Sequence, residues 1–198
     1  MPASQTSLDT LSPAPKSKTP QLVPPRTTPS TPLHILAGWK RTLPEVDVQW
    51  ISRALFKDTS YGSFDEQRID KLWWYPPQLR LSNNIKSGVD RYFAHALLLW
   101  MTRRLWKVRL VCPYPSCHDR ELVSAGIHPR VRQVLDVSSF YLIASEDLQC
   151  TRCKRKVVSW SHNIVEQLDI GHRVQFPCLL TGRNSCDMRI VRLLRNRG

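Results

Sequence analysis

The sequence predicts an α+β fold, with helices at both ends of the domain and short antiparallel strands at its centre. Three observations lead to this prediction: helical spacing of apolar residues near the front, two cysteine pairs bordered by strand-like segments, and an amphipathic terminal segment. A hydrophobic fraction of 41% in 198 residues is enough for one packed core. We therefore expect one domain rather than several.

The first 32 residues differ in composition from the rest of the chain. They hold eight of the 15 prolines and show no hydrophobic periodicity, which is typical of a segment without fixed structure. We expect a disordered Pro/Thr-rich arm over residues 1–32, followed by a single domain over residues 33–198.

The front of that domain is expected to be helical. Pro44 suits the first position of a helix, and two acidic residues follow it in the first turn. Apolar residues from Trp50 onward share one face, which predicts a helix ending near Phe56. The segment RYFAHALLLWM, residues 91–101, is dense in helix formers and predicts a second, buried helix. Between them, the cluster KLWWYPPQ at 71–78 is read as a core anchor, with base stacking or docking as alternatives.

The centre of the domain is expected to be β-sheet. Residues 104–112, RLWKVRLVC, alternate apolar and basic side chains, which predicts a half-buried strand leading into Cys112. The segments ELVSAGI, RQVLDV, FYLIA and KVVSW predict further short strands. Two helices should complete the fold, one capped by Ser161 and ending near Leu168, the other capped by Asn184 or Ser185 and reaching the C-terminus.

Four cysteines form two closely spaced pairs, Cys112-x4-Cys117 and Cys150-x2-Cys153. Zinc takes four thiolates in a tetrahedron, and two tight turns can present all four sulfurs to one ion. The first pair follows a predicted strand and the second precedes one, as in zinc knuckles. The sequence thus predicts one Zn2+ in a zinc-ribbon-like antiparallel β centre, with these four cysteines as ligands. A redox pair, which needs a following helix, and four buried free thiols are the alternatives.

The other cysteines and histidines are not expected to bind metal. Cys178 and Cys186 lie in apolar or helical sequence and are predicted to be small buried residues. His118 directly follows Cys117, and adjacent residues rarely point at one ion, so an exposed turn position is expected. Surface or core positions are also expected for His128, His162 and His172.

The charge of the chain favours a polyanionic partner. The net charge is +13 and the pI is near 9.9, and such a surface attracts nucleic acid through release of counterions. Eight cations flank the cysteine pairs, and a shared metal would make the two groups neighbours. We predict that DNA or RNA binds to these residues: Arg103, Arg104, Lys107, Arg109, Arg152, Lys154, Arg155 and Lys156. The segment MRIVRLLRNRG is either a further contact or a solvated amphipathic helix.

Three other classes of protein are disfavoured. The longest apolar run, Ala96 to Met101, is far below the roughly 20 residues of a spanning helix, so no membrane partner is expected. The N-terminus lacks a secretory pattern, so we expect a nuclear or cytoplasmic protein with reduced thiols. The chain is not expected to be an enzyme, because the nearby carboxylates lack catalytic spacing. Solvated positions are expected for Asp119, Glu121, Asp136, Glu146 and Asp147.

Several motifs occur together in this chain: KLWWYPPQ, LWMTRRLWKVRLVCPYPSC, RQVLDV, LQCTRC and DIGHRVQFPCLLTGRNSCDMRIVRLLR. With them, the segment from about Leu43 to Arg197 resembles an uncharacterised "domain of unknown function" family with paired cysteines. That family recurs in multicopy, transposon-like genes of fishes, other animals and fungi. The resemblance implies a domain at the front of a longer protein, which would make this chain truncated at its C-terminus. It implies no biochemical activity.

Three functional hypotheses follow. The first is a non-enzymatic zinc-binding module that binds nucleic acid and derives from a mobile-element protein. The second is a zinc-structured protein-interaction module that meets a protein partner through its tryptophan-rich surface. The third is the N-terminal fragment of a larger transposase- or nuclease-like enzyme. Salt dependence separates the first two, because nucleic-acid binding weakens steeply with salt.

Overall fold

The computed structural model describes residues 34–57, 63–65, 67–78 and 94–196. The arm expected over residues 1–32 lies outside this part of the chain and stays a prediction. Within the described residues, no helix has both the length and the apolar character needed to cross a lipid bilayer.

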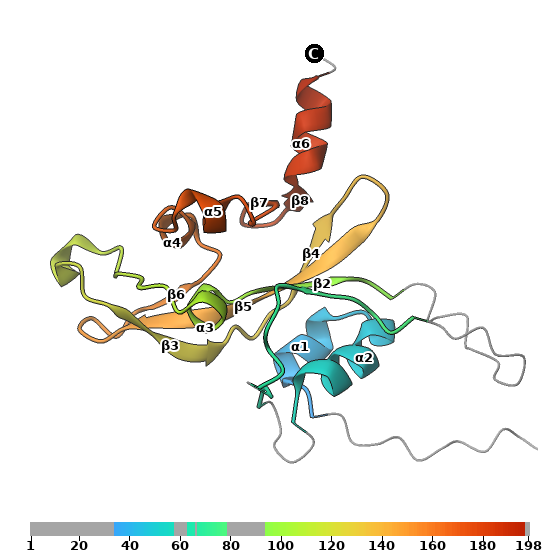
Figure 1. The fold of residues 1–198 in the computed structure, drawn as a ribbon, viewed down its shortest axis with the longest axis horizontal. Coiled ribbons are helices and arrows are strands. Elements are labelled where there is room, and N and C mark those ends of the chain that lie inside the picture. Colours follow the sequence, from blue (N-terminus) through green and yellow to red (C-terminus); the bar gives the residue numbers. More distant parts are fainter. Residues whose placement is uncertain (1–33, 58–62, 66, 79–93, 197–198) are drawn as a thin grey trace, which may run out of the picture. The chain divides into compact units, whose positions relative to one another are not determined.

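The longest strand, β5 (Phe140–Cys150), is the axis of the sheet, and its two halves have different neighbours (Figure 1). The first half pairs parallel with β2 (Leu97–Trp100) and antiparallel with β4 (Arg132–Leu135). The second half pairs antiparallel with β3 (Leu122–Ile127) and β6 (Lys156–Val158). The metal-site candidates lie at the end of this second half.

Shorter strands extend the sheet at both edges, with β1 beyond β2 and with β8 and β7 beyond β4. Strand β1 (Trp73–Trp74) pairs with β2, and β8 (Ser185–Asp187) pairs with both β4 and β7 (Cys178–Leu180). The helices are α1 (Ala37–Thr42), α2 (Glu45–Leu55), α3 (Thr102–Trp106), α4 (His162–Val165), α5 (Ile170–Arg173) and α6 (Met188–Arg195). The described chain is therefore a mixed α+β structure, as expected.

The central strands are buried on both faces. In β2, Leu97 and Leu99 belong to a core that also contains the side chains of α1 and α2. Leu98 and Trp100 belong to a second core, which includes four buried cysteines: Cys112, Cys117, Cys150 and Cys178. A strand covered on both sides needs apolar residues at every position. This requirement explains the unbroken run LLLW.

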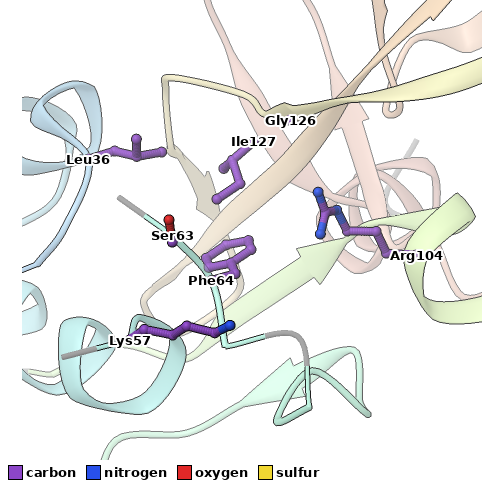
Figure 2. Close-up of a pocket in the computed structure, with 7 residues that line it drawn as sticks. All are labelled: Leu36, Lys57, Ser63, Phe64, Arg104, Gly126 and Ile127. Atoms are coloured by element: carbon purple, nitrogen blue, oxygen red, sulfur yellow. The ribbon is translucent and has the colours of Figure 1, made fainter. Parts of the chain in front are cut away.

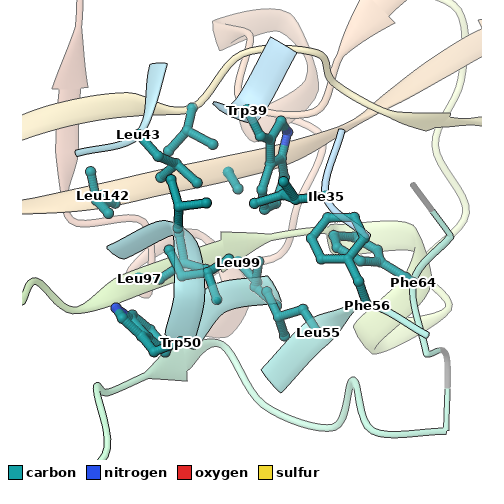
Figure 3. Close-up of a cluster of buried hydrophobic side chains, with 14 of the residues drawn as sticks. Ile35, Trp39, Leu43, Trp50, Leu55, Phe56, Phe64, Leu97, Leu99 and Leu142 are labelled. Atoms are coloured by element: carbon teal, nitrogen blue, oxygen red, sulfur yellow. The ribbon is translucent and has the colours of Figure 1, made fainter. Parts of the chain in front are cut away.

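The first core is built around Trp39 (Figure 3). Its ring lies edge-on to Phe56 and Phe64, with centroids at 5.5 and 5.6 Å, and its Nε1–H donates to the carbonyl of His128 at 2.8 Å. Neighbouring Gly38 permits this close packing, because a Cβ there would lie 2.1 Å from the Pro129 carbonyl oxygen. The core thus fixes α1 against the segment before β4.

Several predicted elements are confirmed. The front helix is α2, with Pro44 one position before its first residue. The strands predicted at ELVSAGI, RQVLDV, FYLIA and KVVSW are β3, β4, β5 and β6, and β5 runs on to Cys150. The aromatic cluster is only partly a core anchor: Trp73 packs on Tyr141 with centroids 5.1 Å apart, whereas Tyr75 is 69% exposed.

Two predicted elements are wrong. The helix expected over 91–101 is, in its described part, strand β2, because an unbroken apolar run suits a buried strand as well as a buried helix. The strand expected over 104–112 begins instead as α3, and only Val111 forms an isolated bridge, to Glu121. The backbone N–H groups of Arg103 and Arg104, in the first turn of α3, donate to a carboxylate distant in sequence, which favours the helix there.

The two predicted C-terminal helices exist with different bounds. Ser161 is the N-cap residue of α4, but its side chain makes no capping hydrogen bond, and the helix ends at Val165 rather than Leu168. The terminal helix begins at Met188, because the Asp187 carboxylate caps it by accepting from the Arg189 N–H at 2.8 Å. The residues expected to cap it, Asn184 and Ser185, lie instead in the turn and strand before it.

Candidate metal centre

The first cysteine pair lies on a tight reversal between two antiparallel segments. The Cys112 N–H donates to the Arg120 carbonyl at 2.8 Å, and the Leu122 N–H donates to the Leu110 carbonyl at 2.8 Å. The chain therefore enters and leaves the turn as a hairpin. Cys117 ends a short 3-10 helix, Pro115–Cys117, within it, and both cysteines are buried in the second core.

The second pair lies on the turn between β5 and β6. Cys150 is the last residue of β5, and its N–H donates to the Arg155 carbonyl at 3.1 Å while its carbonyl accepts from the Lys154 N–H at 3.1 Å. Cys153 lies inside the loop that these two hydrogen bonds close. This is the strand–turn–strand context that the sequence predicted for the second pair.

Both turns use left-handed backbone at residues other than glycine. His118 and Asp119 have φ of 47° and 55°, and Lys154 has φ of 60°. Such conformations cost about 1–2 kcal/mol per residue and persist only where the surroundings fix them. In the described chain just one further non-glycine residue, Lys107, has positive φ. Backbone strain is thus concentrated at the cysteine turns.

Pairing of β3 with β5 brings the two turns together, since Leu122 lies opposite Cys150. The four sulfurs all lie within 4.8 Å of one another, and those of Cys112 and Cys153 are 3.9 Å apart. Metal–sulfur bonds of about 2.3 Å in a tetrahedron separate the sulfurs by about 3.8 Å. The arrangement needs to contract by about 1 Å at most to hold a metal ion.

The environment of the sulfurs suits a metal that prefers thiolates. Three of the cysteines are buried and Cys153 is half-buried, among apolar side chains of the second core. Four sulfur ligands without nitrogen or oxygen favour zinc or iron over magnesium or calcium. No histidine or carboxylate belongs to the cluster in the described part of the chain.

The thiols differ in acidity because their surroundings differ. Hydrogen bonds from the backbone N–H groups of Cys153 and Arg152 lower the pKa of the Cys150 thiol to about 6. Burial raises the pKa of Cys112 to about 12, and burial likewise raises the pKa of Cys117. A cation that binds the cluster must therefore displace protons from at least two thiols near neutral pH.

The cations predicted beside the second pair are all exposed: Arg152, Lys154 and Arg155 lie on the β5–β6 turn, and Lys156 is the first residue of β6. Arg155 also holds the two turns together, because its guanidinium carbon lies 4.6 Å from the centre of the Tyr114 ring in the first turn. This cation–π contact was not foreseen from the sequence. An arginine beside one cysteine pair and an aromatic residue inside the other is the signal that would have suggested it.

The cations predicted before the first pair line one hollow of about 430 Å³, which we call the cationic hollow. Its lining consists of Arg103, Arg104, Lys107, Arg109, Glu121 and Ser124. Arg103 Nη1 is 2.7 Å from Glu121 Oε1, so this guanidinium is held in place. Lys107 and Arg109 are exposed and form no ion pair within the described residues. The second group of cations is not part of this lining.

Glu146 binds the backbone of two residues that line the cationic hollow, and its position corrects the expectation that it would be solvated. It is fully buried, not solvated, and its Oε1 accepts from the backbone N–H groups of Arg103 at 2.8 Å and Arg104 at 3.3 Å. Ser124 Oγ donates to its other oxygen at 3.3 Å, and Arg104 Nε lies 3.7 Å away. Burial raises the pKa of this carboxyl group above its usual value. Alternate residues of a strand lie on the same face, so Glu146 shares a face with apolar Leu148, and this spacing could have indicated that Glu146 is buried.

The remaining predicted positions fall largely as expected. Cys178 is buried against the Tyr141 hydroxyl at 3.1 Å, and Cys186 is half-buried. His118 is an exposed turn residue. The other histidines bind carboxylates: His128 with Asp147, His162 with Glu166, and His172 with Asp169.

Comparison with known proteins identifies a family whose description names no activity. A family model described as a domain of unknown function (DUF6729) matches residues 39–198. No curated protein and no solved structure matches the chain. The expected likeness to a zinc ribbon and the expected mobile-element origin therefore stay predictions.

Proposed function

Because the chain belongs to the DUF6729 family, whose description names no activity, we propose its function from the geometry of its own site. It is a zinc-stapled, non-enzymatic module that binds nucleic acid. The observation that supports this most strongly is the junction of two features on one hairpin. The turn that carries Cys112 and Cys117 continues directly from the segment whose cations line the cationic hollow.

Zinc has a structural role in this proposal. Its four ligands are all cysteines, so no coordination position is left for water or substrate, as is usual for structural rather than catalytic zinc. The ion would link the hairpin before β3 to the β5–β6 turn. Its binding free energy would stabilise turns that contain three left-handed residues.

Nucleic acid is proposed as the ligand because the exposed cations have few internal partners. Within the described residues, Lys107, Arg109 and the exposed cations of the β5–β6 turn form no ion pair. Cations that are not neutralised internally attract phosphates and release counterions on binding. The net charge of +13 acts in the same direction at longer range.

A test of this proposal compares salt dependence between charge variants. Labelled oligonucleotides are titrated between about 50 and 200 mM salt, where each phosphate contact contributes about −0.9 to the log–log slope on duplex DNA. The variant Arg152→Gln, Lys154→Gln, Arg155→Gln, Lys156→Gln should flatten the slope, and so should the variant Lys107→Gln, Arg109→Gln. Metal content should stay unchanged in both, because none of these residues is a ligand.

The matched control removes four exposed cations elsewhere, with Arg41, Arg53, Arg130 and Arg183 replaced by glutamine. This variant loses the same charge as the first and should bind with nearly the wild-type slope. Equal flattening in the control would mean that net charge alone governs binding. Absence of binding at low salt by the wild-type protein would reject the nucleic-acid function and favour a protein-interaction module.

A protein-interaction module is the second candidate, and one observation favours it. Helix α6 exposes apolar side chains, with Leu193 at 48% and Leu194 at 67% exposure. Two adjacent exposed leucines on an otherwise cationic helix are compatible with a protein partner. The salt titration above distinguishes the two candidates.

A further inference from the structure

A second hollow, of about 380 Å³, lies beside the cationic hollow and has a different character (Figure 2). Three of its lining side chains are apolar: Leu36 from the segment before α1, Phe64, and Ile127 from the end of β3. Lys57 and Arg104 add two cations. We call it the mixed hollow, because apolar and cationic groups line it together.

Arg104 lines both hollows and so joins them. Strand β3 runs past both as well, with Ser124 in the cationic hollow and Gly126 in the mixed hollow. The register of β3 against β5 shifts between Ser124 and Ile127, and Gly126 has φ of 100° at this irregularity. A Cβ built on Gly126 would meet no atom within 4 Å, so the backbone there borders open space.

The position of Arg104 is fixed rather than adaptable. Its backbone N–H donates to Glu146 Oε1 at 3.3 Å, and its guanidinium Nε lies 3.7 Å from Glu146 Oε2. Glu146 is fully buried and is itself bound by Arg103 and Ser124. The backbone of Arg104 is therefore held by Glu146, which places the Arg104 side chain where the two hollows meet.

A ligand that fills both hollows must carry an anionic group next to a flat apolar group. An unpaired nucleotide has this combination, with a phosphate for the cationic hollow and a base for the apolar wall of the mixed hollow. In a duplex the faces of the bases are stacked on one another and only their edges are exposed in the grooves, so no whole base is available to enter the mixed hollow. We propose that the paired hollows bind one unpaired nucleotide of a single strand, with its base in the mixed hollow.

This inference rests on the nucleic-acid function and adds the strand state and the base contact to it. Base contacts of this kind tolerate any sequence. We therefore expect the protein to prefer single strands over duplex without a marked preference for one base.

The experiment measures fluorescence anisotropy with the full chain and three labelled probes of equal length. They are a thymidine 12-mer, the same 12-mer annealed to its complement, and an abasic 12-mer with an intact phosphate backbone. The wild-type protein should bind the thymidine strand about tenfold more tightly than the abasic strand, which is the effect of one base contact. It should also bind that strand more tightly than the duplex.

The variant Ser63→Trp fills the mixed hollow from an exposed position and should abolish the preference for the thymidine strand over the abasic strand. The control Ser138→Trp places the same ring on an exposed serine of the β4–β5 turn and should keep the preference. If Ser63→Trp does not fold, Lys57→Gln is the second variant. It should weaken binding of the thymidine strand and leave the duplex affinity unchanged.

Equal wild-type affinities for all three probes would overturn the base contact while leaving nucleic-acid binding intact. A thymidine preference that survives in folded Ser63→Trp, or an unchanged affinity of Lys57→Gln for the thymidine strand, would overturn the assignment to the mixed hollow. Failure of the wild-type protein to bind any probe at low salt would overturn this inference together with the proposed function.

Discussion

Residues 140–145 of β5 are covered by apolar side chains on both faces, whereas residues 146–150 are covered on one face only. The first half lies between two cores and has strands β2 and β4 beside it. The other face of the second half carries half-buried polar residues, Asp147 and Gln149, and the strand ends in the cysteine turn. We therefore expect a bound metal to matter most in the second half, where the partner strands β3 and β6 are short and the four cysteines cluster.

Removal of the metal should produce the largest effect, and it should destabilise the second half of β5 and its neighbours while leaving the first half folded. Structural zinc contributes apparent free energies of about 10–16 kcal/mol in zinc-finger peptides. With a chelator, amide protection in hydrogen exchange should be lost in β3, β6 and the end of β5, and largely kept in α2 and β2. Uniform loss of protection would show that the two halves unfold as one unit.

A cavity in the first core should lower the stability of the protein without changing its metal content. Leu99 is fully buried in the first core, and Leu99→Ala should lower the free energy of unfolding by about 2–5 kcal/mol. Metal content should not change, because this core contains none of the four cysteines. The matched control is Leu135→Ala at a position that is 57% exposed, where denaturant titration should show a change within about 0.5 kcal/mol.

Glu146 lies at the boundary between the halves and should make stability depend on pH. Because burial raises its pKa above the usual 4.5, the folded protein holds this proton more tightly than the unfolded chain does. The free energy of unfolding should therefore fall as the pH rises from 4.5 through the raised pKa. Glu146→Gln, compared with wild type by urea titration across this range, should lose this part of the pH dependence. Exposed Glu121→Gln should keep it.

The contact between the two turns should have the smallest effect. Replacing Arg155 by methionine removes the cation over Tyr114 and should cost about 0.5–1 kcal/mol in thermal or urea unfolding. Lys156→Met, one residue further on and without a ring beneath it in the described chain, is the control and should change stability less. An equal loss in both variants would assign the effect to charge rather than to the ring contact.

The sequence was informative where the structure depends on local pattern or on ligand spacing. The cysteine pairs, the strands that follow them and helix α2 are read from spacing alone. It was misleading where tertiary contacts decide. The run LLLW is a strand because β5 pairs with it in parallel, and no local feature of the run distinguishes that outcome from a helix.

The same limit applied to the site. The four cysteines and the lining cations of the cationic hollow could be predicted, because their residue types carry the chemistry. The mixed hollow could not, since it joins Leu36, Phe64 and Ile127, which are ordinary core residues in the sequence. Glu146 was misread as solvated for a related reason: its hydrogen-bond donors, Arg103 and Arg104, are more than 40 residues away in the chain.

The central claim is that four cysteines from two turns hold one metal ion. The most direct test is a titration of the reduced apoprotein with Co2+, followed by displacement with Zn2+. The account predicts absorption typical of tetrahedral thiolate coordination that saturates at one equivalent of metal per chain. It also predicts loss of that signal in Cys112→Ser with Cys153→Ser, and its retention in Cys178→Ser with Cys186→Ser. No signal in the wild-type protein, or an undiminished signal in the first double variant, would contradict the account.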